Sequence, residues 1–142
     1  MGTRIAVLND GILQQIDTPQ NLYDYPANIF VAGFIGSPAM NLFDGELVER
    51  DGAVVVNTDE FGLEIPENLA DTYRPHLGED IVLGVRPEDI HDPDFAPPDI
   101  SQQLVEAKVD VTELMGDEVV VYLQAGDTDF LGRFDPRTDA KV

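Results

Sequence analysis

Phosphate-binding loops, histidines and carboxylates are the groups through which a chain of this composition could do chemistry. A bound triphosphate is held by the pattern G-x-x-x-x-G-K-[ST], whose backbone amides and lysine contact the phosphate oxygens. The sequence contains no such pattern. We therefore expect these residues to hydrolyse no ATP and to bind no nucleotide cofactor.

The two histidines, His76 and His91, lie in polar segments flanked by proline. A histidine that acts as a general base needs a reacting partner within hydrogen-bond reach. No serine stands beside either histidine in the strand–turn–helix context of a nucleophile elbow. We expect both to be ordinary surface residues, and we assign no residue to catalysis.

Two acidic stretches superficially resemble a calcium-binding loop. The stretch from Asp92 has Pro97 where the loop requires glycine and Gln103 where it requires a bidentate glutamate. The stretch from Asp127 has its glycine, but Leu131 replaces an oxygen ligand. Because calcium takes about six to eight oxygen ligands, we expect solvated turns and no metal site.

The overall charge narrows the possible partners. Among 142 residues, 28 are acidic and 8 are Lys or Arg, which gives a formal net charge of -20. Such a surface repels phosphate backbones and anionic lipids, so nucleic acid is not an expected partner. No apolar run approaches the ~20 residues needed to span a bilayer, so no direct membrane insertion is expected. The charge could also reflect a salt-rich source, where such a surface is screened and stays hydrated.

The first quarter of the chain has the pattern of a hairpin followed by two short helices. Residues 4–8 and 12–16 are rich in β-formers and flank the turn signal Asn-Asp-Gly. Thr18 precedes Pro19 as an N-cap precedes the first helical residue, and Asn28 can cap a second helix that ends at Gly36. Neither helix is long enough to be stable alone.

The remaining sequence predicts short strands separated by glycine turns. We expect strands over residues 45–50, 53–58, 62–65, 80–86, 104–114, 118–124 and 128–134, one helical insert over 67–73, and an exposed loop over 91–103. Apolar residues alternate with polar ones in the strand from residue 104, so one face should be buried. The pattern indicates a mainly β fold, an OB-fold-like, partly open barrel preceded by the hairpin and the two short helices.

The segment of residues 30–43 is apolar, aromatic and nearly uncharged within an acidic chain. It could be a core segment that packs on the barrel. The alternative is a surface that meets another domain or subunit, because large exposed apolar patches mark interfaces.

Several of these segments together resemble the C-terminal regulatory region of carbohydrate-importer ABC ATP-binding proteins, of the maltose and glycerol-phosphate importer type. The resemblance rests on residues 4–11, 15–19, 22–23, 26–28 and 30–42, and on the motifs Gly-Val-Arg-Pro-Glu-Asp-Ile at 84–90 and Leu-Met-Gly-Asp-Glu at 114–118. The two motifs are similar to those of the transport-associated OB (TOBE) domain of that family.

The resemblance implies a chain truncated at both ends. Residues 1–36 would be the tail end of the nucleotide-binding domain with its connecting helices, and residues 37–142 a TOBE/OB-type regulatory domain that is incomplete at its C-terminus. The full-length protein would be a transport-coupled ATPase that uses ATP and Mg. It would be cytoplasmic, peripheral on the cytoplasmic face of the cell membrane, and would drive uptake of sugars or related solutes through permease subunits.

In that family the regulatory domains contact each other across a dimer, so the resemblance implies a homodimer. An unpaired strand edge also invites pairing with another chain, and we expect a dimer or strand exchange. The positions expected to be structural or to lie at an interface are Phe34, Gly36, Ser37, Pro38, Met40, Asn41, Arg86, Pro87 and Glu88.

Two other functions remain open. A free-standing OB-fold module could bind an oligosaccharide or a small anion, although such barrels use stacking aromatics or cations and this chain has no tryptophan and few basic residues. The second open function is that of an acidic interaction module without a link to transport. The coding sequence upstream of Thr3 discriminates among them, because only the transporter interpretation requires it to encode a P-loop.

Overall fold

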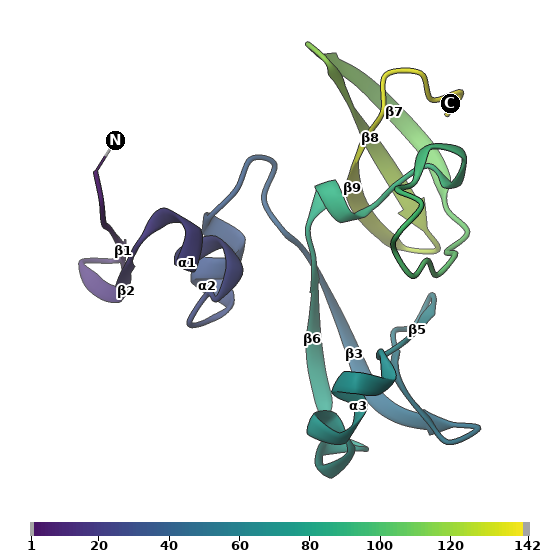
Figure 1. Ribbon diagram of the computed structural model, residues 1–142, viewed down its shortest axis with the longest axis horizontal. Helices are drawn as coiled ribbons and strands as arrows, with labels where there is room; N and C mark the ends of the chain where they lie inside the picture. Colours follow the sequence, from purple (N-terminus) through teal and green to yellow (C-terminus); the bar gives the residue numbers. More distant parts are fainter. Residues whose placement is uncertain (1, 141–142) are drawn as a thin grey trace.

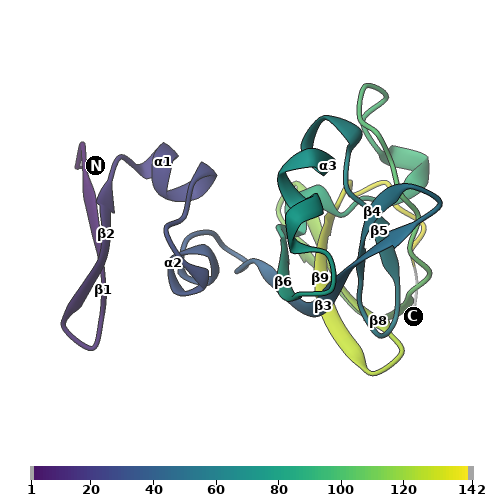
Figure 2. The ribbon, with the colours of Figure 1, turned by 90° about the horizontal axis from the view of Figure 1, so that it is seen from below.

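The structure, a computed structural model, describes residues 2–140 and has two parts (Figure 1). The N-terminal part contains the antiparallel hairpin of β1 (Ile5–Asn9) and β2 (Ile12–Asp17), followed by the helices α1 (Pro19–Asp24) and α2 (Ile29–Phe34). Residues 41–140 form the second part, which we call the β body. Figure 2 shows the N-terminal part to one side of the β body, with residues 35–40 leading from one to the other.

Local sequence signals explain the N-terminal part. Asp10 and Gly11 have φ values of 48° and 78°, as a tight hairpin turn requires. Asn28 caps α2 by accepting the backbone N–H of Val31 at 2.9 Å, and the side chain of Thr18 caps α1 in the same way. The predicted hairpin and both predicted helix starts are therefore confirmed.

The β body consists of two antiparallel sheets. The first has the order β5-β4-β3-β6, formed by β3 (Asn41–Arg50), β4 (Ala53–Asn57), β5 (Gly62–Glu64) and β6 (Asp80–Val85), with α3 (Glu67–Tyr73) between β5 and β6. The second has the order β7-β8-β9, formed by β7 (Lys108–Met115), β8 (Glu118–Ala125) and β9 (Thr128–Phe134). Short 3₁₀ turns lie at Arg74–His76, Pro87–Asp89 and Pro93–Phe95.

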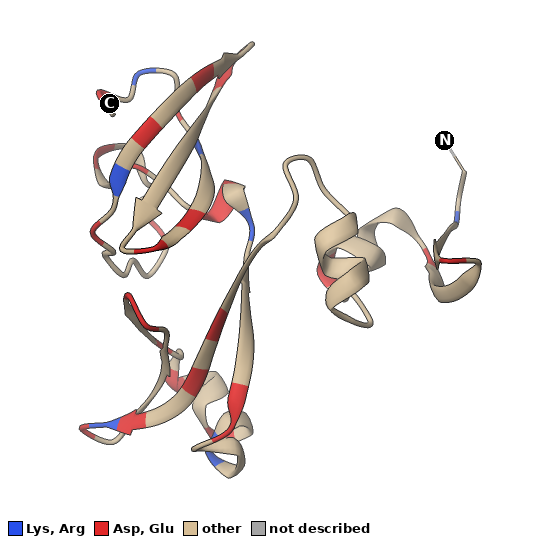
Figure 3. Ribbon diagram, turned by 180° about the vertical axis from the view of Figure 1, so that it is seen from behind, with Lys and Arg blue, Asp and Glu red and all other residues tan. Residues whose placement is uncertain are grey.

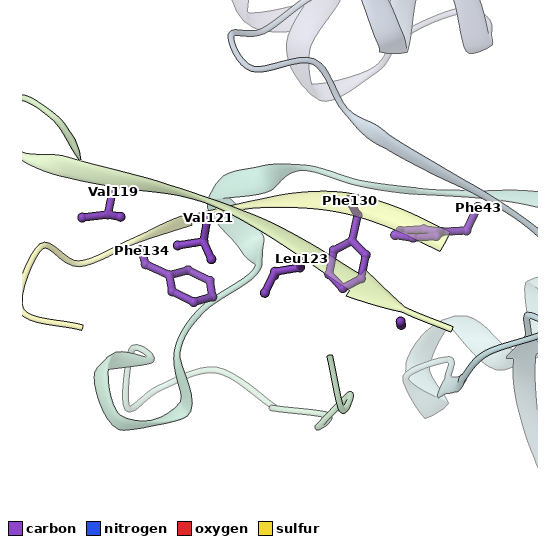
Figure 4. Packing of buried hydrophobic residues seen from close by; sticks show 7 residues of the cluster. Phe43, Val119, Val121, Leu123, Phe130 and Phe134 are labelled. Atoms are coloured by element: carbon purple, nitrogen blue, oxygen red, sulfur yellow. The ribbon is translucent and has the colours of Figure 1, made fainter. Parts of the chain in front are cut away.

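The main core of the β body lies where the two sheets meet. Phe43 of β3 contacts the rings of Phe61 and Phe130 edge to face, at centroid distances of 5.2 and 5.6 Å. Figure 4 shows Leu123, Phe130 and Phe134 directed to the same side of β8 and β9. A smaller cluster packs β3 and β4 against α3. Aromatic packing between the sheets thus holds the β body together.

The expected fold class is confirmed. The chain is mainly β, carries few short helices, and its sheets do not close into a barrel over residues 2–140. Two strand starts differ from expectation by more than one residue. β3 begins at Asn41 because its first residues pair with β6, Asn41 opposite Val85. β7 begins only at Lys108, because residues 104–107 pair with no strand and Leu104 is 78% exposed.

The acidic residues are spread over both sheets and their loops, whereas α1 and α2 carry little charge (Figure 3). This distribution matches a solvated acidic surface on the β body rather than one concentrated site. None of the helices formed by residues 2–140 has the length and hydropathy needed to cross a bilayer.

Candidate functional site: the joint between the helices and the β body

The structure brings the residues selected from the sequence together where α2 leads into the β body. We call this region the joint and define it as Tyr23, residues 34–41 and residues 86–88. Its members come from α1, from the connection after α2, from the start of β3 and from the turn after β6. The joint is where the N-terminal part and the β body make side-chain contacts.

Arg86 lies at the centre of the joint and is only 7% exposed. Its Nη1 donates to the carbonyl oxygen of Ile35 at 2.9 Å, and its Nη2 donates to the carbonyl oxygen of Tyr23 at 2.5 Å. The guanidinium also lies 3.8 Å from the centre of the Tyr23 ring. Both carbonyls belong to the C-terminal ends of short helices, where carbonyl groups lack helical partners. One side chain from the β body therefore caps both helices.

Gly36 makes room for this arrangement. It has a φ of 115°, a conformation that favours glycine. A Cβ at this position would lie 3.3 Å from Nη1 of Arg86. A larger residue would therefore strain the backbone and crowd the guanidinium.

A second line of polar contacts runs from α1 to the sheet of β7–β9. The hydroxyl of Tyr23 donates to Glu88. The other carboxylate oxygen of Glu88 lies 3.9 Å from Nη1 of Arg133 in β9. Nε of Arg133 donates to Glu118 in β8 at 2.9 Å, and this hydrogen bond raises the pKa of Arg133 above its ordinary value. Partly buried charges thus connect α1 to β9 and, through Arg133, to β8.

The start of β3 is fastened to β9 by an amide. Nδ2 of Asn41 donates to the carbonyl of Leu131 at 2.8 Å, and Oδ1 of Asn41 accepts the N–H of Leu131 at 2.8 Å. Through these two hydrogen bonds, the side chain of Asn41 links β3 to the backbone of β9. Met40 covers Gly84 so closely that a Cβ on Gly84 would lie 2.4 Å from the sulfur.

The other predicted positions have different surroundings. Pro87 is fully buried at the first residue of its 3₁₀ turn. The Ser37–Pro38 peptide bond is cis, and Ser37 is exposed. Phe34 stacks on Phe30 at a centroid distance of 5.8 Å and remains 63% exposed. Phe34, Gly36 and Ser37 are thus the predicted positions that are exposed.

Sequence reasoning did not select Tyr23, Glu118 or Arg133 as site residues. The contacts of Tyr23 with Arg86 and Glu88 bridge more than sixty residues of sequence. No local pattern signals such a pairing. Tyr23 and Glu118 lie in segments that carry the family resemblance, and Arg133 is one of few basic residues in a chain with many carboxylates.

The contacts of the joint link the N-terminal part to the β body. Within residues 2–140, no three His, Asp or Glu side chains converge in a way that could hold a metal ion. The polar groups of the joint are used in contacts between its own elements. What the geometry can do is fix the direction of α1 and α2 relative to the β body.

Residues 36–90, which begin at the joint and include all of Arg86-Pro87-Glu88, match the family described as "MalK OB fold domain". These residues are similar to the MalK OB fold domain family. Its N-terminal boundary falls at Gly36, directly after the carbonyl of Ile35 that Arg86 holds. The joint therefore fastens the residues that match this family to the helices that precede them.

Curated relatives match almost the whole chain. It is 46% identical over 99% of its length to an osmoprotective compounds uptake ATP-binding protein, GgtA, of Synechocystis sp.. It is 42% identical over 98% to the oligosaccharides import ATP-binding protein MsmX of Bacillus subtilis. It is 42% identical over 100% to the trehalose/maltose import ATP-binding protein MalK of Thermococcus litoralis. The chain spans only 38% of the length of each of these relatives.

Proposed function

We propose that this chain is the regulatory and dimerisation part of the ATP-binding subunit of an ABC importer for sugars or related solutes. The single observation that carries the proposal is Arg86, which caps two helices outside the MalK OB fold domain from a position inside it. A domain that merely trails behind an ATPase needs no such contact. A domain that must move with the ATPase needs a rigid contact of this kind.

The division of the chain follows from this proposal. Residues 1–36 are the tail of a nucleotide-binding domain with its connecting helices, and residues 37–142 are the regulatory domain. ATP and Mg are bound by polypeptide outside this chain, which itself turns over no nucleotide. The whole subunit works at the cytoplasmic face of the membrane together with permease subunits.

The joint gives this role a physical mechanism. Breaking the contacts of Arg86 would leave a buried charge and two carbonyls without their partners, which is costly. Small displacements of α1 and α2 therefore carry the β body with them as one piece. A self-complementary contact between two β bodies then holds the two subunits together while their ATPase domains open and close.

The outer edge of β7 is the surface we assign to that contact. β7 is an edge strand whose outward residues include Leu114, 72% exposed, and the exposed Met115. Exposed apolar edge strands pair readily with another chain. By symmetry, the same edge of a second copy provides the complementary strand.

Light scattering over a range of concentrations tests the dimer. The expected mass is twice the 15.6 kDa of the chain. Leu114→Lys should shift the equilibrium toward monomer, whereas Leu69→Lys on α3, also exposed, should not. A monomer at high concentration would contradict the dimerisation proposal. Dissociation by Phe34→Lys but not by Leu114→Lys would move the contact to the helices.

The transport role has its own test in the gene. The coding sequence upstream of Thr3 should continue into an ATP-binding domain that contains a P-loop. A natural start codon at Met1 would contradict the proposed role and favour a free-standing module.

A further inference from the structure

Side-chain amides cover one edge of each sheet of the β body. β5 is an edge strand of the first sheet, and β9 is an edge strand of the second. At β5, the amide of Gln103 accepts the N–H of Glu64 at 2.6 Å and donates to its carbonyl oxygen at 2.7 Å. At β9, Asn41 makes the same pair of hydrogen bonds with Leu131. In both places an amide occupies the position that the backbone of a further strand would take.

The backbone groups of Glu64 face the outer side of the first sheet. Residues of an antiparallel strand alternate between bonding to the neighbouring strand and pointing away from it. Ile65 donates its N–H to the carbonyl of Val54, next to β5 on β4, at 2.8 Å. The N–H and the carbonyl of the adjacent Glu64 therefore point away from β4. Without Gln103 they would be free to bond to another strand.

The cover of β5 depends on this one side chain. Residues 96–107, which include Gln103, form no helix or strand. Pro97 and Pro98 in this segment have no N–H to donate. Within residues 2–140, no other side chain forms a hydrogen bond with the backbone of β5. Loss of the Gln103 amide would thus leave the outer edge of β5 uncovered.

We propose that Gln103 closes the β5 edge against strand addition by a second copy of this chain. Unpaired N–H and carbonyl groups on an edge strand are a template for pairing with another chain. The partner that the uncovered edge would take is β5 of the second copy, because two copies of one edge form a two-fold contact that closes on itself. The inference goes beyond the proposed role in transport and does not rest on the proposed contact at β7.

Light scattering of the full 142-residue chain in molar KCl tests the proposal, because salt screens the repulsion between two acidic copies. Gln103→Ala should raise the mass by a factor of about two or more over the unmodified chain at equal concentration, as a new two-fold contact forms. Gln102→Ala changes an exposed neighbour that is not part of this pair of bonds, and it should leave the mass unchanged. Equal masses for Gln103→Ala and the unmodified chain would overturn the proposal.

The mass of the unmodified chain separates this proposal from the contact at β7. If the unmodified chain is a dimer through β7, a second contact at β5 joins the dimers into an open-ended row, and the mass of Gln103→Ala rises with concentration. If the unmodified chain is a monomer, Gln103→Ala should stop at a dimer. Both results support closure by Gln103, and the second also contradicts the contact at β7.

A proline at position 64 shows whether the new association uses this edge. Proline has no N–H and is tolerated on an edge strand where that N–H faces outward. Glu64→Pro in the Gln103→Ala background removes the outward donor and spares the bond between Ile65 and Val54. The mass should therefore return to that of the unmodified chain. A double variant as large as Gln103→Ala would assign the association to another surface and refute the proposal.

Hydrogen exchange of the unmodified chain gives an answer that does not depend on the folding of any variant. Glu64 and Gly62 are alternate residues of β5, so the N–H groups of both point away from β4. The N–H of Glu64 is bonded to Gln103. The protection factor of the Glu64 amide should therefore exceed that of the Gly62 amide by about tenfold or more. Equal protection of the two amides would show that Gln103 does not hold this edge in solution.

Discussion

The guanidinium of Arg86 holds Tyr23 in two ways, by a hydrogen bond to its carbonyl oxygen and by a contact with its ring at 3.8 Å. These two contacts fix both the backbone and the side chain of Tyr23, and with them the end of α1. Because Arg86 also binds the carbonyl of Ile35, the same group determines where both helices end relative to the β body.

Removal of this group should loosen the joint. Arg86→Ala leaves two carbonyls without their charged donor, so we expect a loss of about 2–3 kcal/mol in the free energy of unfolding. Arg86→Lys should recover only part of that loss, because lysine lacks the planar fork. Urea unfolding gives the energies, and hydrogen exchange in residues 19–35 should accelerate in the same order.

An exposed arginine serves as the control for that series. Arg74 pairs with Glu49 and Asp71 at the surface, and exposed pairs contribute about 0–1 kcal/mol. Arg74→Ala should therefore cost less than Arg86→Lys. If Arg86→Ala were no more harmful than Arg74→Ala, the joint would not be the rigid connection described above.

The close approach of Met40 to Gly84 predicts a strong coupling between the two positions. Gly84→Ala places a Cβ 2.4 Å from the present position of the sulfur, so Met40 must move and the variant should lose about 1–2 kcal/mol of stability. In a Met40→Ala background the same substitution should cost less than about 0.5 kcal/mol. Thermal or urea unfolding of the four proteins measures this cycle.

Gly33→Ala provides the matched control for the cycle. No atom lies within 4 Å of a Cβ at Gly33, which is inside α2. Alanine should therefore stabilise the helix by about 0.5–1 kcal/mol. If Gly84→Ala left the free energy of unfolding unchanged, this result would show that Met40 has free space to move into.

Acid should break a local ion pair near the C-terminal end. The side chain of Arg137 and its backbone N–H bond to Asp135 and lower the pKa of Asp135 to about 2 from its ordinary 3.8. A depressed folded-state pKa contributes stability that is present above pH 3.8 and is lost as pH falls through about 2. Carbonyl NMR should show Asp135 titrating near 2, and Arg137→Gln should return the midpoint toward 3.8.

Salt should stabilise the chain. The net charge of -20 repels itself in the compact state, and the Debye length falls from about 10 Å at 0.1 M salt to about 3 Å at 1 M. The melting temperature should therefore rise between low salt and molar KCl. Lys108→Glu, which adds negative charge to β7, should make the rise steeper. A flat melting temperature would contradict adaptation to high salt.

Local signals in the sequence were sufficient to predict most of the fold. Asp10-Gly11 and Asp51-Gly52 both adopt the positive φ values that tight hairpin turns need, and Asn28 caps its helix as predicted. The errors lie where tertiary contacts decide. The pairing of Asn41 with Val85 extends β3. No local pattern near position 41 predicts a partner so distant in the chain.

The candidate site was only half visible in the sequence. The Arg86-Pro87-Glu88 motif was identified through its resemblance to a family, yet its physical role depends on Tyr23 and Arg133, which are distant in sequence. A surface interaction and a buried intramolecular contact have the same appearance in a sequence. Only coordinates reveal that Arg86 is buried and that Phe34 is exposed.

The pair of hydrogen bonds between Asn41 and Leu131 has a consequence for biosynthesis. Asn41, the first residue of the β body, is bonded to β9. Glu88 likewise pairs with Arg133, which is synthesised 45 residues later. While the ribosome is still translating β8, the hairpin, the helices and the first sheet have emerged without these partners. The nascent chain can form these contacts only after β9 has left the exit tunnel, which makes them a late event in synthesis.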